Sequence, residues 1–292
     1  MGAKYFGLFR GLVGIFMFGI QTYFLSKAFS YLIRIIIFST QPSLLDHDIL
    51  LIFYLGLNII DWSSIIIAIF LQTFLFSVGM IFNKRLIQFS AITVYLGIIL
   101  FFFTVLLSDV KFSVNAFINS IDYRNFVEFE NLGPLATVAG TTFAYFSIII
   151  LSYGDFTRYV KNEKELKKGN LSLVLNLIIF SFFALFIVIG VDAFLNQNPE
   201  NLSRILTNPT DIIGSLDNLL ITNLVLFLII IASASTNLIA NFIPSQYILI
   251  NLAPSSLSLK SSSFIITFIG FLVGVSWLTY LSQIGILSFI DT

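Results

Sequence analysis

The chain has 292 residues, of which 58% are hydrophobic and only 10% are charged, and its formal net charge is zero. Soluble domains carry about a quarter of charged residues, so this composition predicts a polytopic protein of the lipid bilayer. The zero net charge argues against a nucleic-acid-binding surface, and the absence of cysteine excludes disulfides and thiolate metal sites.

A membrane-spanning helix needs about 20 mostly apolar residues, and the chain contains seven such stretches. In chain order they are residues 8–36, 62–81, 87–108, 134–153, 171–194, 219–250 and 263–283. The segment 49–60 is too short to cross a bilayer, so we expect it to lie at the interface before the second span. The sequence therefore predicts an all-α integral membrane protein with about seven transmembrane helices, in a single transmembrane domain over residues 1–292.

The basic residues predict the orientation of the chain, because cytoplasmic loops of membrane proteins are enriched in Lys and Arg. With a cytoplasmic N-terminus and seven spans, ten of the 15 basic residues fall on the inner side. These ten are Lys4, Arg10, Lys84, Arg85, Arg158, Lys161, Lys164, Lys167, Lys168 and Lys260. We therefore expect a multi-pass protein of the cell (inner) membrane whose N-terminus is cytoplasmic.

Enzyme chemistry has little support in this sequence. The single histidine, His47, lies in a predicted loop between Asp46 and Asp48, and one histidine provides neither a metal cage nor a catalytic triad. No glycine-rich loop that could cradle a phosphate is present, so an ATP-driven pump is also unsupported. We expect a protein that is not an enzyme.

The sixth span has a polar centre, at a depth where lipid offers no hydrogen-bond partners. Ala232, Ser235 and Thr236 share one helical face, and one carbonyl with two hydroxyls suits part of the oxygen shell of a hard cation. Asn237 and Asn241 lie one turn apart on a different face, and an amide supplies both a donor and an acceptor for the edge of a heterocycle. The alternative is that these small polar residues only pack helices.

Other polar and aromatic positions lie in the first and fourth spans. Gln21 is an amide at membrane depth, with Met17 one turn before it on the same face. Tyr145 and Phe146 offer flat faces on which a planar ring can stack, although aromatics are so common here that any one of them is more simply lipid-facing or core. Lys27 lies six residues beyond Gln21, and we expect it to extend to the outer interface rather than to act at a site.

Three short patterns together resemble the nucleobase:cation symporter family. They are F-G-I-Q-T at 18–22, G-D-F-T-R-Y at 154–159 and A-x-x-S-T-x-x-x-x-N at 232–241. Members of that family include the sodium–hydantoin symporter and permeases for purines, cytosine, uracil, allantoin and thiamine. The resemblance implies a LeuT-type inverted-repeat fold and cation-coupled uptake of a nucleobase or related small planar nitrogen heterocycle.

The resemblance also implies roles for individual residues in substrate binding. Gln21 would hydrogen-bond the substrate, and Asn241 matches the substrate-binding asparagine of the family. Phe146 falls at a stacking aromatic, and Tyr145 precedes it where the hydantoin symporter has a glycine. Met17 replaces a stacking tryptophan, so the substrate of this chain is left open.

The coupling ion would be sodium or a proton, and no other cofactor is expected. By the same resemblance, the Ala232 carbonyl and the hydroxyls of Ser235 and Thr236 form half of a sodium site. The two GxxxG patterns, at 7–11 and 270–274, are most simply close helix packing.

The seven spans resemble family helices three to nine, so the domain is expected to be incomplete at both ends. A further segment or a second chain would then supply the first two helices, and transport by these residues alone is not expected. The alternative function is a non-transporting membrane scaffold or the remnant of a truncated transporter gene.

Overall fold

A computed structural model describes residues 2–108, 110–120, 133, 135–140, 142–143, 153–157, 160–195, 219–277 and 280. Its α-helices are α1 (Gly2–Thr40), α2 (Ile59–Ser77), α3 (Met80–Ser108), α4 (Val110–Ser120), α7 (Tyr153–Thr157), α8 (Glu163–Leu195), α10 (Leu219–Asn237), α11 (Ile243–Leu252) and α12 (Leu259–Ser276). Short 3₁₀ helices occupy Pro42–Asp46 and Asp48–Leu51, and one π-helical turn covers Leu238–Phe242. Within the described residues the fold is all-α, as predicted.

Six helical stretches of the described chain are long and apolar enough to cross a membrane. They are Lys4–Thr40, Ile59–Ser77, Ile81–Leu107, Glu163–Val191, Leu219–Leu252 and Leu259–Ser276. Each corresponds to one of the seven predicted spans. The remaining prediction, residues 134–153, falls mostly outside the described residues.

The helix of the second span begins three residues before the approximate predicted start, because a polar cap sets its first residue. α2 starts at Ile59, after Asn58, whose side chain accepts a hydrogen bond from the Asp61 backbone N–H at 3.0 Å. The Asp61 carboxylate accepts in return from the Asn58 backbone N–H at 3.4 Å. This reciprocal capping box satisfies two N–H groups at the helix end.

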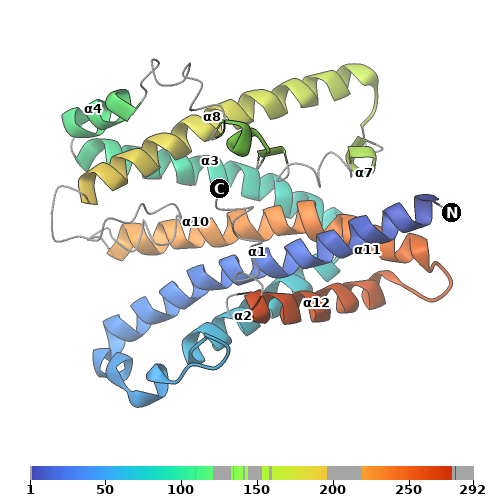
Figure 1. Ribbon diagram of the computed structural model, residues 1–292, viewed down its shortest axis with the longest axis horizontal. Coiled ribbons are helices and arrows are strands. Elements are labelled where there is room, and N and C mark those ends of the chain that lie inside the picture. Colours follow the sequence, from blue (N-terminus) through green and yellow to red (C-terminus); the bar gives the residue numbers. More distant parts are fainter. Residues whose placement is uncertain are drawn as a thin grey trace.

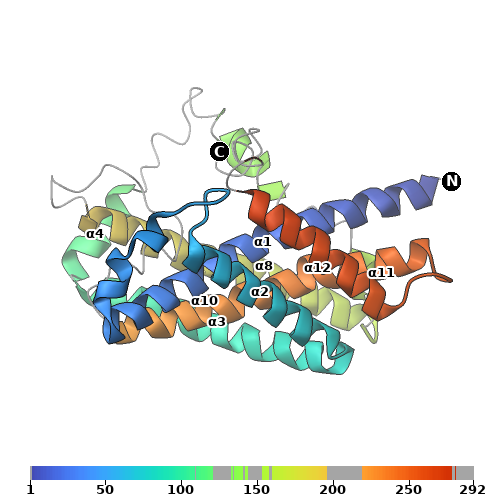
Figure 2. The same cartoon turned by 90° about the horizontal axis from the view of Figure 1, so that it is seen from below.

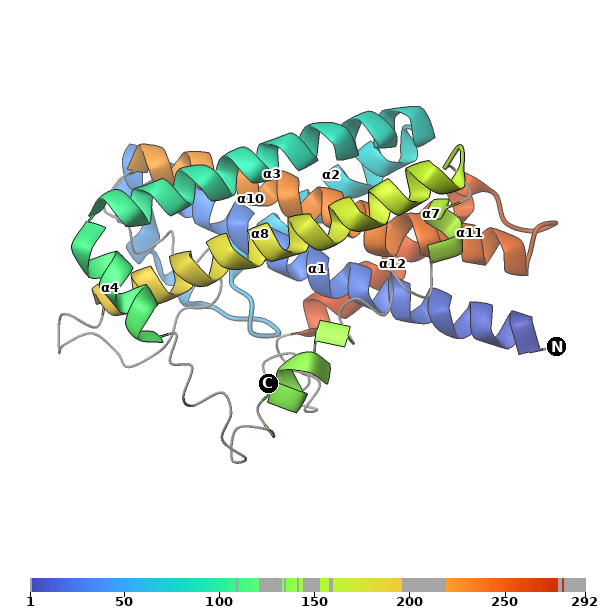
Figure 3. The same cartoon turned by 90° about the horizontal axis from the view of Figure 1, so that it is seen from above.

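The long helices pack with α1 at their centre. In Figure 1, α1 and α10 run side by side through the middle, with α3 and α8 beyond α10 and with α2 and α12 on the other side of α1. The view from below shows α2 and α12 in front of α1, and the view from above shows α3 and α8 covering α10 (Figures 2 and 3). The polar residues of α1 and α10 therefore lie in the interior of the bundle.

Glycine allows α1 and α12 to approach closely. A Cβ atom on Gly19 would lie 2.5 Å from the Gly270 carbonyl oxygen, and one on Gly274 would lie 3.0 Å from the Gly19 carbonyl oxygen. The GxxxG pattern at 270–274 therefore does pack closely, as predicted. In the pattern at 7–11 only Gly11 has a close neighbour, the Ile248 side chain, and a Cβ on Gly7 would meet nothing within 4 Å.

Candidate functional site

A π-helical turn joins α10 to α11 at the polar centre of the bundle. Pro244 follows this turn, and it lacks the N–H that would bond the carbonyl of Ala240 in a regular helix. A wider turn before a proline removes the clash between its ring and that carbonyl, and π-turns of this kind recur at functional sites. The turn contains Asn241, which is 1% exposed, and follows Asn237, which is fully buried.

Asn237 is the centre of a hydrogen-bond network that joins α10 to α1 and α2. Its Nδ2 donates to Gln72 Oε1 at 2.7 Å, and it also lies 3.2 Å from both the Phe18 carbonyl oxygen and Thr22 Oγ1. Gln72 Nε2 in turn donates to Thr22 Oγ1 at 3.0 Å. Asn237, Gln72 and Thr22 are each 0% exposed, so the network satisfies amides that neither water nor lipid could reach.

The network continues to Gln21 through Asn241. Asn241 Nδ2 donates to Asn237 Oδ1 at 2.9 Å and to Gln21 Oε1 at 3.0 Å. Both of its N–H groups are thereby used. Among the described residues, Gln21 Nε2 and Asn241 Oδ1 have no hydrogen-bond partner. The end of the network thus presents one free donor beside one free acceptor.

The structure brings together two of the five residues predicted to bind substrate. Gln21 and Asn241 are directly hydrogen-bonded, and Asn241 is also bonded to Asn237, which the sequence places one turn before it. Met17 is half-buried and packs against a cluster that contains Trp277. Tyr145 and Phe146 lie outside the described residues.

The residues predicted to bind a cation lie along α10, directly before Asn237. The Ser235 side chain is buried and donates from Oγ to the Ala232 carbonyl oxygen at 2.9 Å, so two of the three predicted oxygens are adjacent. A hydroxyl that donates its proton keeps its lone pairs for a cation. The side chain of Thr236 is exposed on the described part of the chain.

Sequence reasoning missed two members of the network, Thr22 and Gln72. Gln72 lies in the middle of the apolar run of α2, where an amide needs a partner for the same reason as Gln21. That argument would have identified it as a candidate. Thr22 carried no comparable signal, because hydroxyls within helices commonly bond their own backbone, and its Oγ1 does donate to the Phe18 carbonyl at 2.7 Å.

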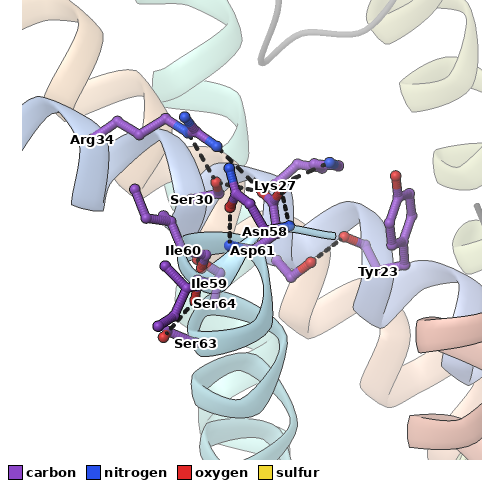
Figure 4. Close-up of polar contacts among 11 residues, drawn as sticks. Tyr23, Lys27, Ser30, Arg34, Asn58, Ile59, Ile60, Asp61, Ser63 and Ser64 are labelled. Atoms are coloured by element: carbon purple, nitrogen blue, oxygen red, sulfur yellow. Dashed lines mark hydrogen bonds and ion pairs between the residues drawn. The ribbon is translucent and has the colours of Figure 1, made fainter. Parts of the chain in front are cut away.

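A second polar cluster joins α1 to the start of α2 and lies apart from the amide network. Figure 4 shows Lys27, Ser30 and Arg34 around Asp61. Ser30 Oγ donates to Asp61 Oδ1 at 2.8 Å, while Lys27 Nζ and an Arg34 nitrogen lie 3.9 and 3.8 Å from the same oxygen. These four residues line part of a cavity of about 490 Å³. Lys27 therefore lies beside a carboxylate, apart from the amide network.

Membrane-length helices around a buried, hydrogen-bonded group of amides define a multi-pass membrane protein with the polar interior of a transporter. The sequence model of one such family, the permeases for cytosine/purines, uracil, thiamine and allantoin, matches residues 1–292. The chain belongs to this family, which confirms the resemblance and the assignment to transporters rather than enzymes.

The chain is also similar to a curated plant protein, a purine-uracil permease NCS1 of Arabidopsis thaliana. The two are 24% identical over 270 residues, which cover 92% of this chain and 42% of that relative. The chain thus spans about two fifths of the length of the relative it matches. No solved structure matches the chain significantly.

Proposed function

We propose that the chain carries the substrate site of a cation-coupled permease for a nucleobase or a related small planar nitrogen heterocycle. Family membership supports the class of protein, and the name of the plant relative supports purines and uracil as the first substrates to test. The fold would be a LeuT-type inverted repeat, in which substrate binds near the bilayer midplane between packed helices.

The free donor and acceptor at the end of the amide network support this proposal most directly. Gln21 Nε2 and Asn241 Oδ1 belong to side chains that are hydrogen-bonded to each other, so they face one small region between α1 and the π-turn. Nucleobases carry an N–H beside a carbonyl or ring nitrogen on one edge. Such an edge can accept from Gln21 and donate to Asn241 at the same time.

Stacking would complete the site. Met17 lies one turn before Gln21 and offers a polarizable thioether to an aromatic ring, a contact worth about 0.3–1.5 kcal/mol. Phe146, with Tyr145 beside it, would supply the second face of the slot, as the family resemblance implies. Flat apolar faces with a few fixed polar groups are the usual composition of a small-molecule pocket.

The coupling ion would bind on α10, next to the substrate. The Ala232 carbonyl and the Ser235 hydroxyl are adjacent oxygens, and Thr236 follows directly in sequence. We assign these three residues to part of the shell of a sodium ion, with a proton as the alternative coupling ion. Because Asn237 belongs to the same turn of the same helix, a movement of the cation ligands would also displace the amide network.

The membrane and the orientation of the chain follow from the charge pattern. The excess of Lys and Arg on one side supports a cytoplasmic N-terminus in the cell membrane. Lys4 and Arg10, near the start of α1, would then face the cytoplasm. The second polar cluster, around Asp61 and nearer the other end of that helix, would face outward. Reporter fusions at the two ends of α1 would test this orientation.

Equilibrium binding to the purified chain tests the proposed substrate class. Radiolabelled uracil, cytosine and hypoxanthine are the probes, with and without sodium. We expect at least one of them to bind, and we expect Asn241→Ala to weaken its binding at least tenfold. Asn251→Ala is the matched control, because Asn251 is an exposed asparagine of the neighbouring helix α11. Failure of all three probes to bind, or equal binding by both variants, would contradict the proposal.

A further inference from the structure

The side-chain amides of the network have only one set of orientations in which every donor faces an acceptor, and a backbone carbonyl determines it. The Phe18 carbonyl oxygen can only accept, and it receives the single hydroxyl proton of Thr22 at 2.7 Å. With its proton used, Thr22 Oγ1 can only accept from the two amides that approach it. The groups that face Thr22 must therefore be Gln72 Nε2, at 3.0 Å, and Asn237 Nδ2, at 3.2 Å.

The orientation of each amide fixes the orientation of the next one, as far as the candidate site. Asn237 Nδ2 faces the Phe18 carbonyl, so its Oδ1 must face Asn241 and accept from Asn241 Nδ2. The same Nδ2 group faces Gln21, which must present Oε1. A reversed amide at any step would place two donors or two acceptors face to face. The free donor on Gln21 and the free acceptor on Asn241 are the outcome.

Gln72 contacts Asn237, the central amide of the network, from a different helix. The series of hydrogen bonds from Thr22 and Gln72 through Asn237 and Asn241 to Gln21 is called the relay below. Its Oε1 accepts the shortest hydrogen bond that Asn237 makes, at 2.7 Å, and its Nε2 bonds Thr22 and the Ala68 carbonyl oxygen at 3.3 Å. Gln72 thus uses both ends of its amide, and it is fully buried. It makes no hydrogen bond to Gln21 or Asn241, so any effect on substrate must pass through Asn237.

We propose that Gln72 is a positioning residue for the specificity of the site, because together with the Phe18 carbonyl it holds the Asn237 amide in the one orientation in which Gln21 presents a donor and Asn241 an acceptor. This inference rests on the proposed function for its ligand. The site then selects heterocycles with an N–H and a neighbouring acceptor on one edge, the edge of a cyclic amide or amidine. Rings whose nitrogens on that edge are methylated are rejected, because Asn241 Oδ1 would lose its donor.

The ratio of two binding constants tests this role separately from stability. The probes are uracil and 1,3-dimethyluracil, which lacks both N–H groups of uracil. In the parent chain uracil should bind at least tenfold more tightly. In Gln72→Met the affinity for uracil should fall about two- to tenfold, the value of one buried hydrogen bond, and the preference over dimethyluracil should shrink. Loss of correctly folded protein would lower the amount of bound probe but would leave the ratio unchanged.

A matched control and a second measurement complete the test. Gln246→Met removes another helical glutamine, whose Nε2 donates to Ser263 Oγ at 2.7 Å and to the Leu259 carbonyl at 3.1 Å, away from the relay. It should keep the parent preference for uracil. An unchanged preference in Gln72→Met would overturn the positioning role, whereas absence of uracil binding in the parent chain would count against the proposed function instead.

The relay can also be tested without any ligand. Gln72→Met and Gln21→Met alter residues that share no hydrogen bond, but both are joined to the Asn237–Asn241 pair. Side chains within one network show non-additive effects, so the melting temperature of the double variant should differ from the sum of the single shifts by about 2 °C or more. Additive shifts would contradict the coupling of Gln72 to Gln21 through Asn237 and Asn241, whatever the substrate is.

Discussion

Replacement of Asn237 by leucine measures the cost of leaving two buried groups of the network unsatisfied. Leucine has nearly the shape of asparagine but neither donates nor accepts. After Asn237→Leu the Phe18 carbonyl still accepts from Thr22, and Asn241 still donates to Gln21. Two groups lose their partner: Gln72 Oε1 loses its 2.7 Å donor, and one N–H of Asn241 loses its 2.9 Å acceptor, in side chains that are 0% and 1% exposed.

The magnitude follows from these two orphaned groups. A hydrogen bond between membrane helices contributes about 0.6 kcal/mol on average, whereas a buried group left without a partner costs about 1–3 kcal/mol. We therefore expect Asn237→Leu to lower the free energy of unfolding by about 2–3 kcal/mol. The double variant with Gln72→Leu removes the orphaned Gln72 acceptor as well, and it should restore at least about 1 kcal/mol of this loss.

Unfolding of the purified chain in mixed detergent micelles, followed by circular dichroism, measures these differences. Asn251→Leu is the control, because an exposed substitution away from any network should change stability by no more than about 0.5 kcal/mol. A double variant that loses the full sum of the two single losses would refute the reasoning. It would show that Gln72 Oε1 finds another partner or is not buried in the folded protein.

Three further predictions concern packing, charge and the coupling ion. Gly270→Ala should destabilise the chain by about 1–3 kcal/mol, because the added Cβ would overlap the ring that packs against it; Gly7→Ala, with nothing within 4 Å, should be neutral or stabilising in the same unfolding assay. Asp61→Asn should cost about 1–2 kcal/mol, since the two partly exposed cations beside it lose their counter-charge, and unchanged stability would contradict that. Ser235→Ala combined with Thr236→Ala should remove the sodium dependence of uracil binding; an equal loss of stability with and without sodium would instead indicate packing alone.

The sequence could predict the elements of this fold because their signals are local. Long apolar runs identify the spans, and the structure describes a membrane-length helix for each predicted span except residues 134–153. The first residue of α2 lies three residues before the approximate predicted start, because its cap depends on a reciprocal bond between Asn58 and Asp61 rather than on hydropathy. Helix ends are set by such polar details, which an apolar window does not contain.

The candidate site was predictable only in part, because its connections join distant parts of the chain. Asn237 and Asn241 are one turn apart on the same helix, so their contact follows from helical geometry. The bonds from Asn237 to Gln72 and Thr22 cross 165 and 215 residues of sequence and need the packed bundle to bring them together. Periodicity cannot supply that information. The prediction that Gln21 and Asn241 share a site came from family resemblance, and the structure places them in direct contact.

An experimental structure of the chain with uracil bound would test the central claim most directly. Our account predicts the ring beside the π-turn, with a carbonyl or ring nitrogen of the base within hydrogen-bond distance of Gln21 Nε2 and an N–H within that distance of Asn241 Oδ1. Uracil bound elsewhere, for example in the cavity between Lys27, Arg34 and Asp61, with the Gln21–Asn241 pair uncontacted, would contradict it.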